Sequence, residues 1–416
     1  MIRKPPSYRA IKRLSYRAIK LSSYCLYILL LTAYCLLPTN HALSQELTPF
    51  AEGIKSPTHA IGVILPLRGE YATFGEEVLK GVLLAARVFG EGGGYPLEVL
   101  VKDSGESPSI AAKAVENLAS DERVVGIVGP LLSVTALEAA RKAQGLKVPI
   151  IVLSQREDLR QVGDYVFRNS LTPSSQTRAI TRYALDILKL KRFAILYPEN
   201  PYGQGLASLF REEVRARGGQ VVMEGSYQEG QTDFGGVIKR LFKIKETEKR
   251  EGRRHIKTFE PTVSVDALYI PDYFDTVSII ASHLAYYNVK GIQLLGTNGW
   301  NSSQLVELGG RYVEGAVFVD GFFPYSPRQE VRTFVEGFRS TYGVEPGILG
   351  AQAYDAMKMF VQLIEEGGKD RKGMREGLAK VKDFRGATGT INFEGGEARK
   401  ELFILTVRDG KIVQLN

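Results

Sequence analysis

The stretch that decides the fold class is residues 60–74, AIGVILPLRGEYATF. Its residues 61–65 form a near-continuous apolar run, which is typical of a strand buried on both faces of a parallel sheet. Pro66 ends the run, a polar loop follows, and apolar residues then recur at helical spacing over 78–89. The stretch therefore predicts a strand–loop–helix unit, in which the loop after the strand is the expected place for function.

The same unit recurs in two series, the second of which begins with a helix at Thr172. The expected strands after the first are 97–101, 124–128, 149–153, 193–197, 220–223, 267–270, 292–295 and one from Ala316 onward, and strand-like segments close the chain at 389–393, 402–407 and 411–415. Repeated βαβ units imply parallel sheets with right-handed crossovers. We therefore predict an α/β protein with two Rossmann-like, three-layer (αβα) lobes that have parallel-sheet cores and are joined by a multi-strand hinge.

We assign residues 58–171 and 322–400 to an N-terminal lobe, and residues 172–321 and 401–416 to a C-terminal lobe. Within the second lobe, residues 239–261 depart from the pattern, because they carry nine basic and four acidic residues and few large apolar groups. We expect this segment to include a solvated, mobile excursion beyond the end of a helix; contact with a partner or an anionic surface is the alternative.

The net charge of +8 belongs to the N-terminus and not to the folded body. Residues 1–44 hold seven basic residues and no acid, and subtracting these seven from +8 leaves +1 for the remainder. A charge excess confined to one end argues against a nucleic-acid partner.

This N-terminus, residues 1–44, reads as a signal peptide. A basic region up to Lys20 precedes an apolar region, 21–37, and residues 42–44 (ALS) supply a small-x-small cleavage site before Gln45. A permanent membrane anchor is the alternative, but the apolar region is short and is interrupted by Thr32 and by tyrosines.

Both cysteines, Cys25 and Cys35, lie in the signal peptide, so a chain that starts near Gln45 has no thiol for a disulfide or a metal site. Tyr34 stands where a lipoprotein signal needs a small residue, which argues against a lipid anchor at Cys35.

The sequence offers no catalytic constellation. The four histidines are His41, His59, His255 and His283, and none of them lies in a loop that follows a predicted strand. A nucleophilic serine would therefore lack a base. No His, Asp or Glu cluster has metal-ligand spacing, and no Walker-type phosphate loop occurs. We expect a protein that is not an enzyme and that binds neither a metal nor a cofactor.

The segment Gly203-Gln204-Gly205 at the start of a helix, with Glu224 about 20 residues further on, resembles a dinucleotide-binding motif but departs from it. The sixth position is Ser208 and not glycine or alanine, and residues 198–201 separate the strand from the glycines, where a dinucleotide turn must be tight.

Ligands of open α/β sheets bind beyond the carboxyl ends of the strands, so the loops at those ends are the expected binding region. They are 68–74, 129–135, 154–156, Tyr202, 272–273 and 298–300. Ser133 begins a helix, where free N–H groups and the helix dipole favour an anion such as a carboxylate. Arg156 could add a bidentate contact. The aromatic residues of these loops could line apolar walls or pack in the core; they are Phe74, Tyr202, Tyr273 and Trp300.

The order of these motifs carries a family resemblance. They are IGVILPLRGEYATFGEEVLKG, VVGIVGPLLSVTA, VPIIVLSQ, DYVFRNS, RFAILYPENPYGQGL, TDFGGVIKRL and GTNGW. Over most of residues 60–416 the chain resembles the periplasmic solute-binding proteins of the Leu/Ile/Val type, which have the class I periplasmic binding protein fold. The resemblance implies two lobes, a hinge, closure on a ligand and delivery to an ABC permease in the inner membrane, with the protein itself periplasmic and monomeric.

The resemblance also implies binding residues. Ser133 matches the family's carboxylate-binding serine, and Ser154 matches a residue that offers backbone contacts to the same carboxylate. Phe74, Tyr202 and Tyr273 match aromatic residues of the ligand loops.

Two positions depart from the family pattern. Arg156 stands where amino-acid binders usually have threonine, and Asn298 stands where they usually have the acid that pairs with the ligand ammonium. An uncharged amide loses a charge-assisted bond worth about 1.5–3 kcal/mol. Asp272 or Glu199 could substitute, or the ligand could be an amide, a urea-like compound or a carboxylate without an amine.

Two functions remain open at this point. The first is a transport protein that closes on a small polar ligand of the amino-acid class. The second is a cell-envelope scaffold that resembles the penicillin-binding-protein activators and contacts a penicillin-binding protein with little or no ligand binding. The many polar residues at the strand ends favour the first function.

Overall fold

The computed structural model describes residues 58–88, 97–251 and 254–415 of the chain. The predicted signal peptide, residues 1–44, lies outside the described residues, and so do both cysteines. The described residues form two large sheets, a two-stranded hairpin and the helices around them. The chain is therefore a mixed α/β protein, as its alternation of strands and helices predicts.

The first sheet has eight strands in the order β13-β14-β15-β5-β4-β3-β1-β2. Strands β1 to β5 pair in parallel, β15 adds to β5 in parallel, and β13 and β14 continue the sheet in antiparallel pairs. The strands are β1 (His59–Leu65), β2 (Leu97–Asp103), β3 (Val124–Val128), β4 (Ile150–Val152), β5 (Val166–Arg168), β13 (Phe384–Gly386), β14 (Gly389–Glu394) and β15 (Glu397–Lys400).

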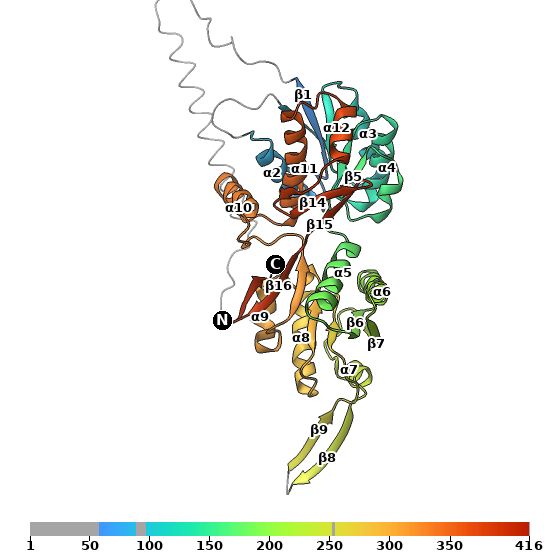
Figure 1. Cartoon of the computed structure of the whole chain (residues 1–416), viewed down its shortest axis with the longest axis vertical. Helices are drawn as coiled ribbons and strands as arrows, with labels where there is room; N and C mark the ends of the chain where they lie inside the picture. Colours follow the sequence, from blue (N-terminus) through green and yellow to red (C-terminus); the bar gives the residue numbers. More distant parts are fainter. Residues whose placement is uncertain (1–57, 89–96, 252–253, 416) are drawn as a thin grey trace, which may run out of the picture. The chain divides into compact units, whose positions relative to one another are not determined.

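Strand β1 is buried on both faces, which confirms the prediction from its apolar run. Ile61, Val63 and Leu65 pack in one core cluster with helices of one layer, whereas Ala60 and Ile64 pack in another with helices of the opposite layer. The first layer contains α2 (Ala72–Ala85), α11 (Ile348–Glu365) and α12 (Arg371–Ala379), and the second contains α3 (Pro108–Ala119) and α4 (Ser133–Gly145) (Figure 1). The sheet is thus the middle of three layers.

The second sheet has seven strands in the order β17-β16-β12-β11-β10-β6-β7. Strands β6, β7, β10, β11 and β12 are parallel, and β16 and β17 are antiparallel additions from the C-terminal part. The strands are β6 (Arg192–Pro198), β7 (Gln220–Tyr227), β10 (Ala267–Tyr269), β11 (Gln293–Gly296), β12 (Val317–Asp320), β16 (Phe403–Arg408) and β17 (Lys411–Gln414).

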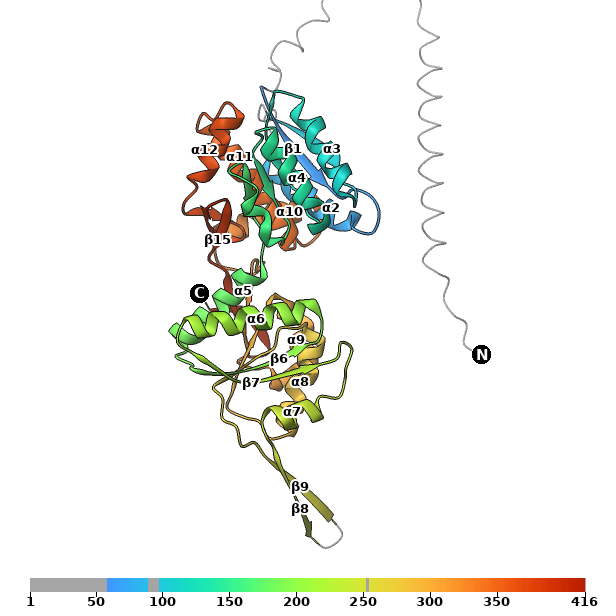
Figure 2. The ribbon, with the colours of Figure 1, turned by 90° about the vertical axis from the view of Figure 1, so that its right-hand side faces the viewer.

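Helices cover both faces of the second sheet as well. Residues of α5 (Pro173–Arg182), the π-helical turn η2 (Tyr183–Ile187) and α6 (Pro201–Ala216) share a core cluster on one face. Residues of α7 (Gly235–Leu241), α8 (Phe274–Tyr286) and α9 (Ser303–Gly309) pack on the other (Figure 2). Two αβα lobes therefore lie within the described residues.

The described chain passes between the two sheets at three places. These connections lead from β5 to α5, from β12 to α10 (Gln329–Tyr342) and from β15 to β16. Helix α10 joins the first lobe, because the Tyr342 hydroxyl donates to the Lys80 carbonyl of α2 at 2.9 Å. The predicted multi-strand hinge is present in this form.

The charged segment 239–261 contains a regular element that the sequence did not predict. Strands β8 (Lys245–Glu251) and β9 (Arg254–Glu260) form an antiparallel hairpin that extends away from the second sheet (Figures 1 and 2). Cross-strand pairs such as Lys257 with Glu246 (2.9 Å) and His255 with Glu248 (2.8 Å) replace the missing apolar contacts. A hairpin that is polar on both faces has no period-2 alternation, so its strands could not be recognised.

Three short strands were also missed. Strands β5, β13 and β15 have only three or four residues each, which is too short for a periodic signal. Helix α7 precedes the hairpin and ends at Leu241, and Lys243 just beyond it has a left-handed backbone with φ of 45°. Among the described residues, no helix has both the length and the apolar character that a membrane crossing needs.

Helices α2 and α11 approach each other through glycines. A Cβ on Gly81 would overlap the Gly350 carbonyl oxygen, and the Gly350 N–H donates to the Glu77 carboxylate of α2 at 3.1 Å. Backbone atoms cannot move aside as a flexible side chain can, so residue 81 must be glycine for this packing.

We expect Gly81→Ala to lower the free energy of unfolding by about 1–3 kcal/mol, because the added methyl group overpacks the α2–α11 contact. Urea unfolding of the purified protein measures this loss. Gly145→Ala is the control, because Gly145 ends α4 and a Cβ added there would meet nothing within 4 Å. Equal stabilities of the two variants would contradict the close approach.

Candidate functional site

Two serine hydroxyls meet at the carboxyl edge of the first sheet. Ser133 is the first residue of α4, after β3, and Ser154 follows β4; their Oγ atoms are 3.1 Å apart. Ser154 is buried, and its Oγ accepts the Arg156 N–H at 3.2 Å, whereas Ser133 is exposed. Parallel strands bring these two loops together although 21 residues separate them in the sequence.

The first turn of α4 has backbone N–H groups that find no acceptor among the described residues. The Thr135 and Ala136 N–H groups donate to the Leu132 carbonyl, whereas those of Ser133 and Val134 have no acceptor among the described residues. Free N–H groups at the positive end of a helix dipole favour a negatively charged group. Together with the serine hydroxyls, they form an arrangement that suits a carboxylate.

The side chain of Arg156 is held by Asp158, and only its backbone N–H contacts the serine pair. Arg156 Nε and Nη2 donate to the two carboxylate oxygens of Asp158 at 2.6 and 2.8 Å. This fork raises the pKa of Arg156 and lowers the pKa of Asp158. A ligand carboxylate would have to compete with Asp158 for the guanidinium group.

Phe74 lies within the first turn of α2, which begins at Ala72, and not in the preceding loop as the sequence suggested. Its ring is about half exposed and lies 6.3 Å from the Tyr71 ring, measured between centroids. It therefore offers apolar surface at the same edge of the first sheet that carries Ser133.

Two tyrosines form a stacked pair at the carboxyl edge of the second sheet. Tyr202 is the second residue of α6 and Tyr273 caps α8; their ring centroids are 5.6 Å apart with planes inclined by 17°. The Tyr202 hydroxyl lies 3.2 Å from Thr297 Oγ1, and burial raises the pKa of Tyr202 to about 12. Tyr273 is 54% exposed, so one side of the stacked pair is accessible.

Asn298 lies in a short 3-10 helix, η3 (Asn298–Trp300), which a neighbouring helix holds in place. The Asn298 N–H donates to Gln176 Oε1 at 3.0 Å, and Gln176 is a buried residue of α5. Sequence reasoning missed Gln176, because nothing in the helical pattern of α5 distinguishes a buried glutamine. Trp300 is fully buried and donates to the Ile270 carbonyl at 3.2 Å, so its ring belongs to the core and the ligand-wall interpretation is wrong.

The two acids that could have replaced the missing family acid already have partners. The Tyr227 hydroxyl and the Tyr273 N–H donate to the two oxygens of Asp272 at 2.5 and 2.8 Å, and burial raises the pKa of Asp272. Ser226 and Gln228 donate to Glu199. Both carboxylates therefore already accept hydrogen bonds within the protein, and Glu199 is the more exposed of the two.

Asp320 is a further acid of this edge that the sequence analysis missed. It ends β12, is 7% exposed, and accepts hydrogen bonds from Asn301 Nδ2 at 2.8 Å and from the Gly321 N–H at 2.6 Å. Burial raises the pKa of Asp320 to about 7. The signal was available, because Asp320 follows the apolar run AVFV in the same way that Asp272 follows its own strand.

The glycines that imitate a dinucleotide motif have a structural explanation. Asn200 Oδ1 accepts the Gly203 N–H at 2.9 Å and caps α6, and a Cβ on Gly203 would crowd the Pro198 carbonyl. Glu224 lies inside β7 and pairs with Arg211 through two bonds of 2.7 Å. Glu224 is thus engaged and does not face an open turn as a ribose-binding acid would.

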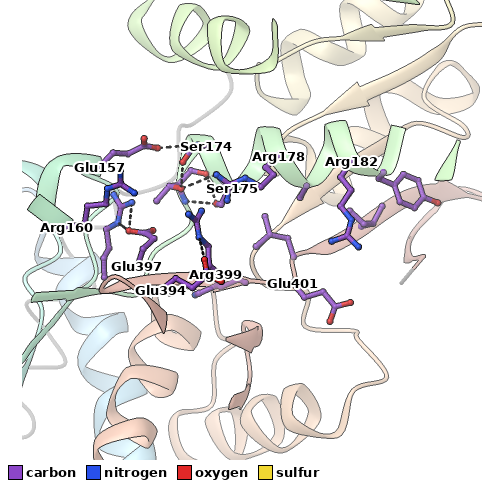
Figure 3. A pocket seen from close by; sticks show the side chains of 18 of the residues that line it. Glu157, Arg160, Ser174, Ser175, Arg178, Arg182, Glu394, Glu397, Arg399 and Glu401 are labelled. Atoms are coloured by element: carbon purple, nitrogen blue, oxygen red, sulfur yellow. Dashed lines mark hydrogen bonds and ion pairs between the residues drawn. The ribbon is translucent and has the colours of Figure 1, made fainter. Parts of the chain in front are cut away.

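A separate cavity of 1210 Å³ lies beside the hinge and contains none of the seven expected residues. Its walls come from the 3-10 helix η1 (Glu157–Gln161), from α5 and η2, and from β15 and β16. Figure 3 shows Arg178 and Arg182 on α5, across from Glu397 and Arg399 on β15. Several of its charges pair with one another, including Arg168 with Glu397 and Arg399 with Glu394. The strand ends, with their free donors, are the better candidate for a ligand site.

Within the described part of the chain, no group of three or more His, Cys, Asp or Glu side chains is placed to hold a metal ion.

The raised pKa of Asp320 predicts a pH-dependent stability. The carboxyl group of Asp320 loses its proton near pH 3.9 in the unfolded chain and near pH 7 in the folded protein. Its contribution to the free energy of unfolding is therefore complete below pH 4 and is lost as the pH rises through 7. Between pH 4.5 and 8 the wild-type protein should lose roughly 2–4 kcal/mol more free energy of unfolding than Asp320→Asn, as measured by urea titration at each pH.

Parallel curves for wild type and Asp320→Asn would contradict a raised pKa at Asp320.

Comparisons with known proteins agree on one family. A family model described as periplasmic binding protein matches residues 58–411. The Leu/Ile/Val-binding protein homolog 3 of Brucella melitensis is 24% identical over 366 residues, which cover 85% of this chain and 93% of that protein. The leucine binding protein LivK of Thermotoga maritima is 27% identical, with a TM-score of 0.59 over 86% of this chain and 98% of its own. A Rhodospirillum rubrum protein assigned to a branched-chain amino acid ABC transporter shares the fold, with a TM-score of 0.75 at 23% identity over 86% of this chain and 99% of its own.

Proposed function

The chain belongs to the periplasmic binding protein family, and we propose that it captures a small carboxylate-bearing ligand of the amino-acid class between its lobes and delivers it to an ABC transporter. The lobes in this proposal are residues 58–171 with 322–400, and residues 172–321 with 401–416. A signal peptide over residues 1–44 would direct the chain to the periplasm, where the family works. The partner would be a permease of the inner membrane, which a monomer could approach.

The observation that carries this proposal is the serine pair at the start of α4. Ser133 and Ser154 hydroxyls lie 3.1 Å apart beside two backbone N–H groups that have no acceptor in the described chain. A carboxylate accepts several such donors at once, and each charge-assisted bond is worth about 1.5–3 kcal/mol. The relatives named for leucine, isoleucine and valine have ligands that all carry this group.

The second lobe would hold the rest of the ligand. The stacked rings of Tyr202 and Tyr273 offer an aromatic surface, and Thr297 offers a hydroxyl beside it. Closure about the hinge would bring these groups onto a ligand already held by Ser133. No transfer of a proton or a group is involved, so the protein acts by binding and release.

The identity of the ligand depends on how this site treats an ammonium group. Asn298 carries no charge, and Asp272 and Glu199 are occupied by Tyr227, Tyr273, Ser226 and Gln228. A carboxylate or an amide without an α-ammonium group would avoid this deficit, whereas the ammonium group of an amino acid would have to share Asp272 or Glu199 with these donors. The scaffold alternative is less favourable, because a protein without a ligand gains nothing from free donors at its strand ends.

A thermal-shift screen of the chain from Gln45, first stripped of bound ligand by unfolding and refolding, tests the proposal. The panel holds amino acids, their amides, short carboxylates and urea-like compounds. A ligand present at a hundredfold excess over its Kd adds about 2.7 kcal/mol to the stability of the folded state, so a true ligand should stand out. Hits confined to compounds without an α-ammonium group would exclude amino acids as ligands, and a flat panel would contradict the transport function and favour the scaffold.

We expect Ser133→Ala and Tyr202→Ala each to weaken binding of the best compound in the screen by about tenfold or more, since each removes a direct contact. Isothermal titration calorimetry measures the Kd, and the melting temperature checks that both variants fold. Ser340→Ala in α10 and Tyr286→Ala at the far end of α8 are the matched controls. Unchanged affinity in both site variants would rule out this cleft.

A further inference from the structure

Arg168 ends β5 and is almost completely buried together with its acidic partner. Arg168 Nε and Nη2 donate to Glu397 Oε2 at 2.8 and 2.6 Å, and both residues are less than 10% exposed. Glu397 is the first residue of β15, the strand that pairs with β5. A buried charge pair of this kind requires that its remaining hydrogen-bonding groups find partners.

The third guanidinium nitrogen of Arg168, Nη1, contacts the loop that contains Ser154. Arg168 Nη1 donates to the carbonyl oxygen of Gln155 at 3.2 Å and also to that of Arg156. These two residues directly follow Ser154, whose hydroxyl pairs with that of Ser133. One guanidinium group therefore joins β15 to the backbone of residues 155 and 156, next to Ser154. A lysine could not make all these contacts, because its ammonium group has no planar fork.

Strand β15 is also the strand that enters the hinge. Lys400 ends it, and the next strand, β16, begins at Phe403 in the second sheet. Lys400 Nζ donates to Thr388 Oγ1 at 2.9 Å, and Thr388 in turn donates to the buried Asp355 of α11. The strand is therefore held at both ends, by Arg168 at its start and by Thr388 at its end, where the chain crosses to the other lobe.

We propose that Arg168, with Glu397, is a positioning residue that fixes the Ser154 loop in its binding geometry and links it to the hinge strand β15. This inference rests on the proposed function, because it assumes that Ser154 takes part in ligand binding. Arg168 contacts no ligand itself and acts through the backbone that it holds.

The test compares Arg168→Lys with a matched variant, Arg371→Lys. Arg371 is a partly buried arginine, more exposed than Arg168, that donates to three backbone carbonyls, those of Ala119, Asp121 and Val124, before and at the amino end of β3. Both variants keep the charge and lose guanidinium contacts to backbone carbonyls, but only Arg168 lies next to the loop that contains Ser154. The probe is L-leucine, titrated by calorimetry, and hydrogen exchange of the Leu153 and Arg156 amides is followed in the protein without ligand.

We expect Arg168→Lys to weaken L-leucine binding about tenfold and to speed exchange of these two amides about tenfold, whereas Arg371→Lys changes neither and lowers only the melting temperature. Unchanged affinity in Arg168→Lys would overturn the proposal even if its melting temperature falls, because a purely structural role would have that result. Should Arg168→Lys not fold, Glu397→Gln takes its place, with a smaller loss of affinity expected because the bonds to the two carbonyls remain.

Failure of the proposed function has a different signature. If the wild-type protein does not bind L-leucine, L-leucine is not a ligand, and the exchange measurement alone then decides the role of Arg168. Faster exchange at Leu153 and Arg156 in Arg168→Lys supports the link to β15, and unchanged exchange overturns it.

Discussion

Burial of the parallel strands on both faces is the constraint on which the rest of this structure depends. Because helices cover both sides of β1 and β3, no polar side chain lies in the buried run 60–65 of β1 or in β3. Polar side chains gather where the strands end, and all parallel strands of a sheet end at the same edge. Ser133, Ser154, Tyr202, Tyr273 and Thr297 all lie at such ends. The position of the candidate site is therefore a consequence of how the core is packed.

The same edges hold acids that the protein has already satisfied. Asp272 and Asp320 are largely buried, and each accepts hydrogen bonds from neighbouring side chains and backbone N–H groups. Burial raises the pKa of both carboxyl groups, so their environment disfavours the negative charge. In contrast, the start of α4 has donors without acceptors among the residues that the structure describes. The first lobe thus offers hydrogen-bond donors that suit an anion, whereas the second lobe offers aromatic rings and hydroxyls.

The three connections between the lobes begin beside the candidate site. Arg168 lies at the end of β5, immediately before the first connection, and Asp320 lies at the end of β12, immediately before the second. Gln176, in the first turns of α5, fixes the backbone of Asn298. The groups that hold the binding loops are therefore the same groups that border the hinge. If the lobes close on a ligand as proposed, such an arrangement would couple the geometry of the loops to that closure.

The sequence by itself determined the α/β class, the alternation into two lobes and the strand-end loops, because apolar runs and helical spacing are local properties that burial imposes on a chain. It also located Ser133 and Ser154, since both follow predicted strands. Only the tertiary structure decided that Trp300 belongs to the core, that Asp158 holds Arg156, and that segment 239–261 forms a hairpin. It alone showed Gln176 and Arg168, whose partners lie up to 229 residues away. Pairing across such separations depends on which elements pack together, and no local pattern records that.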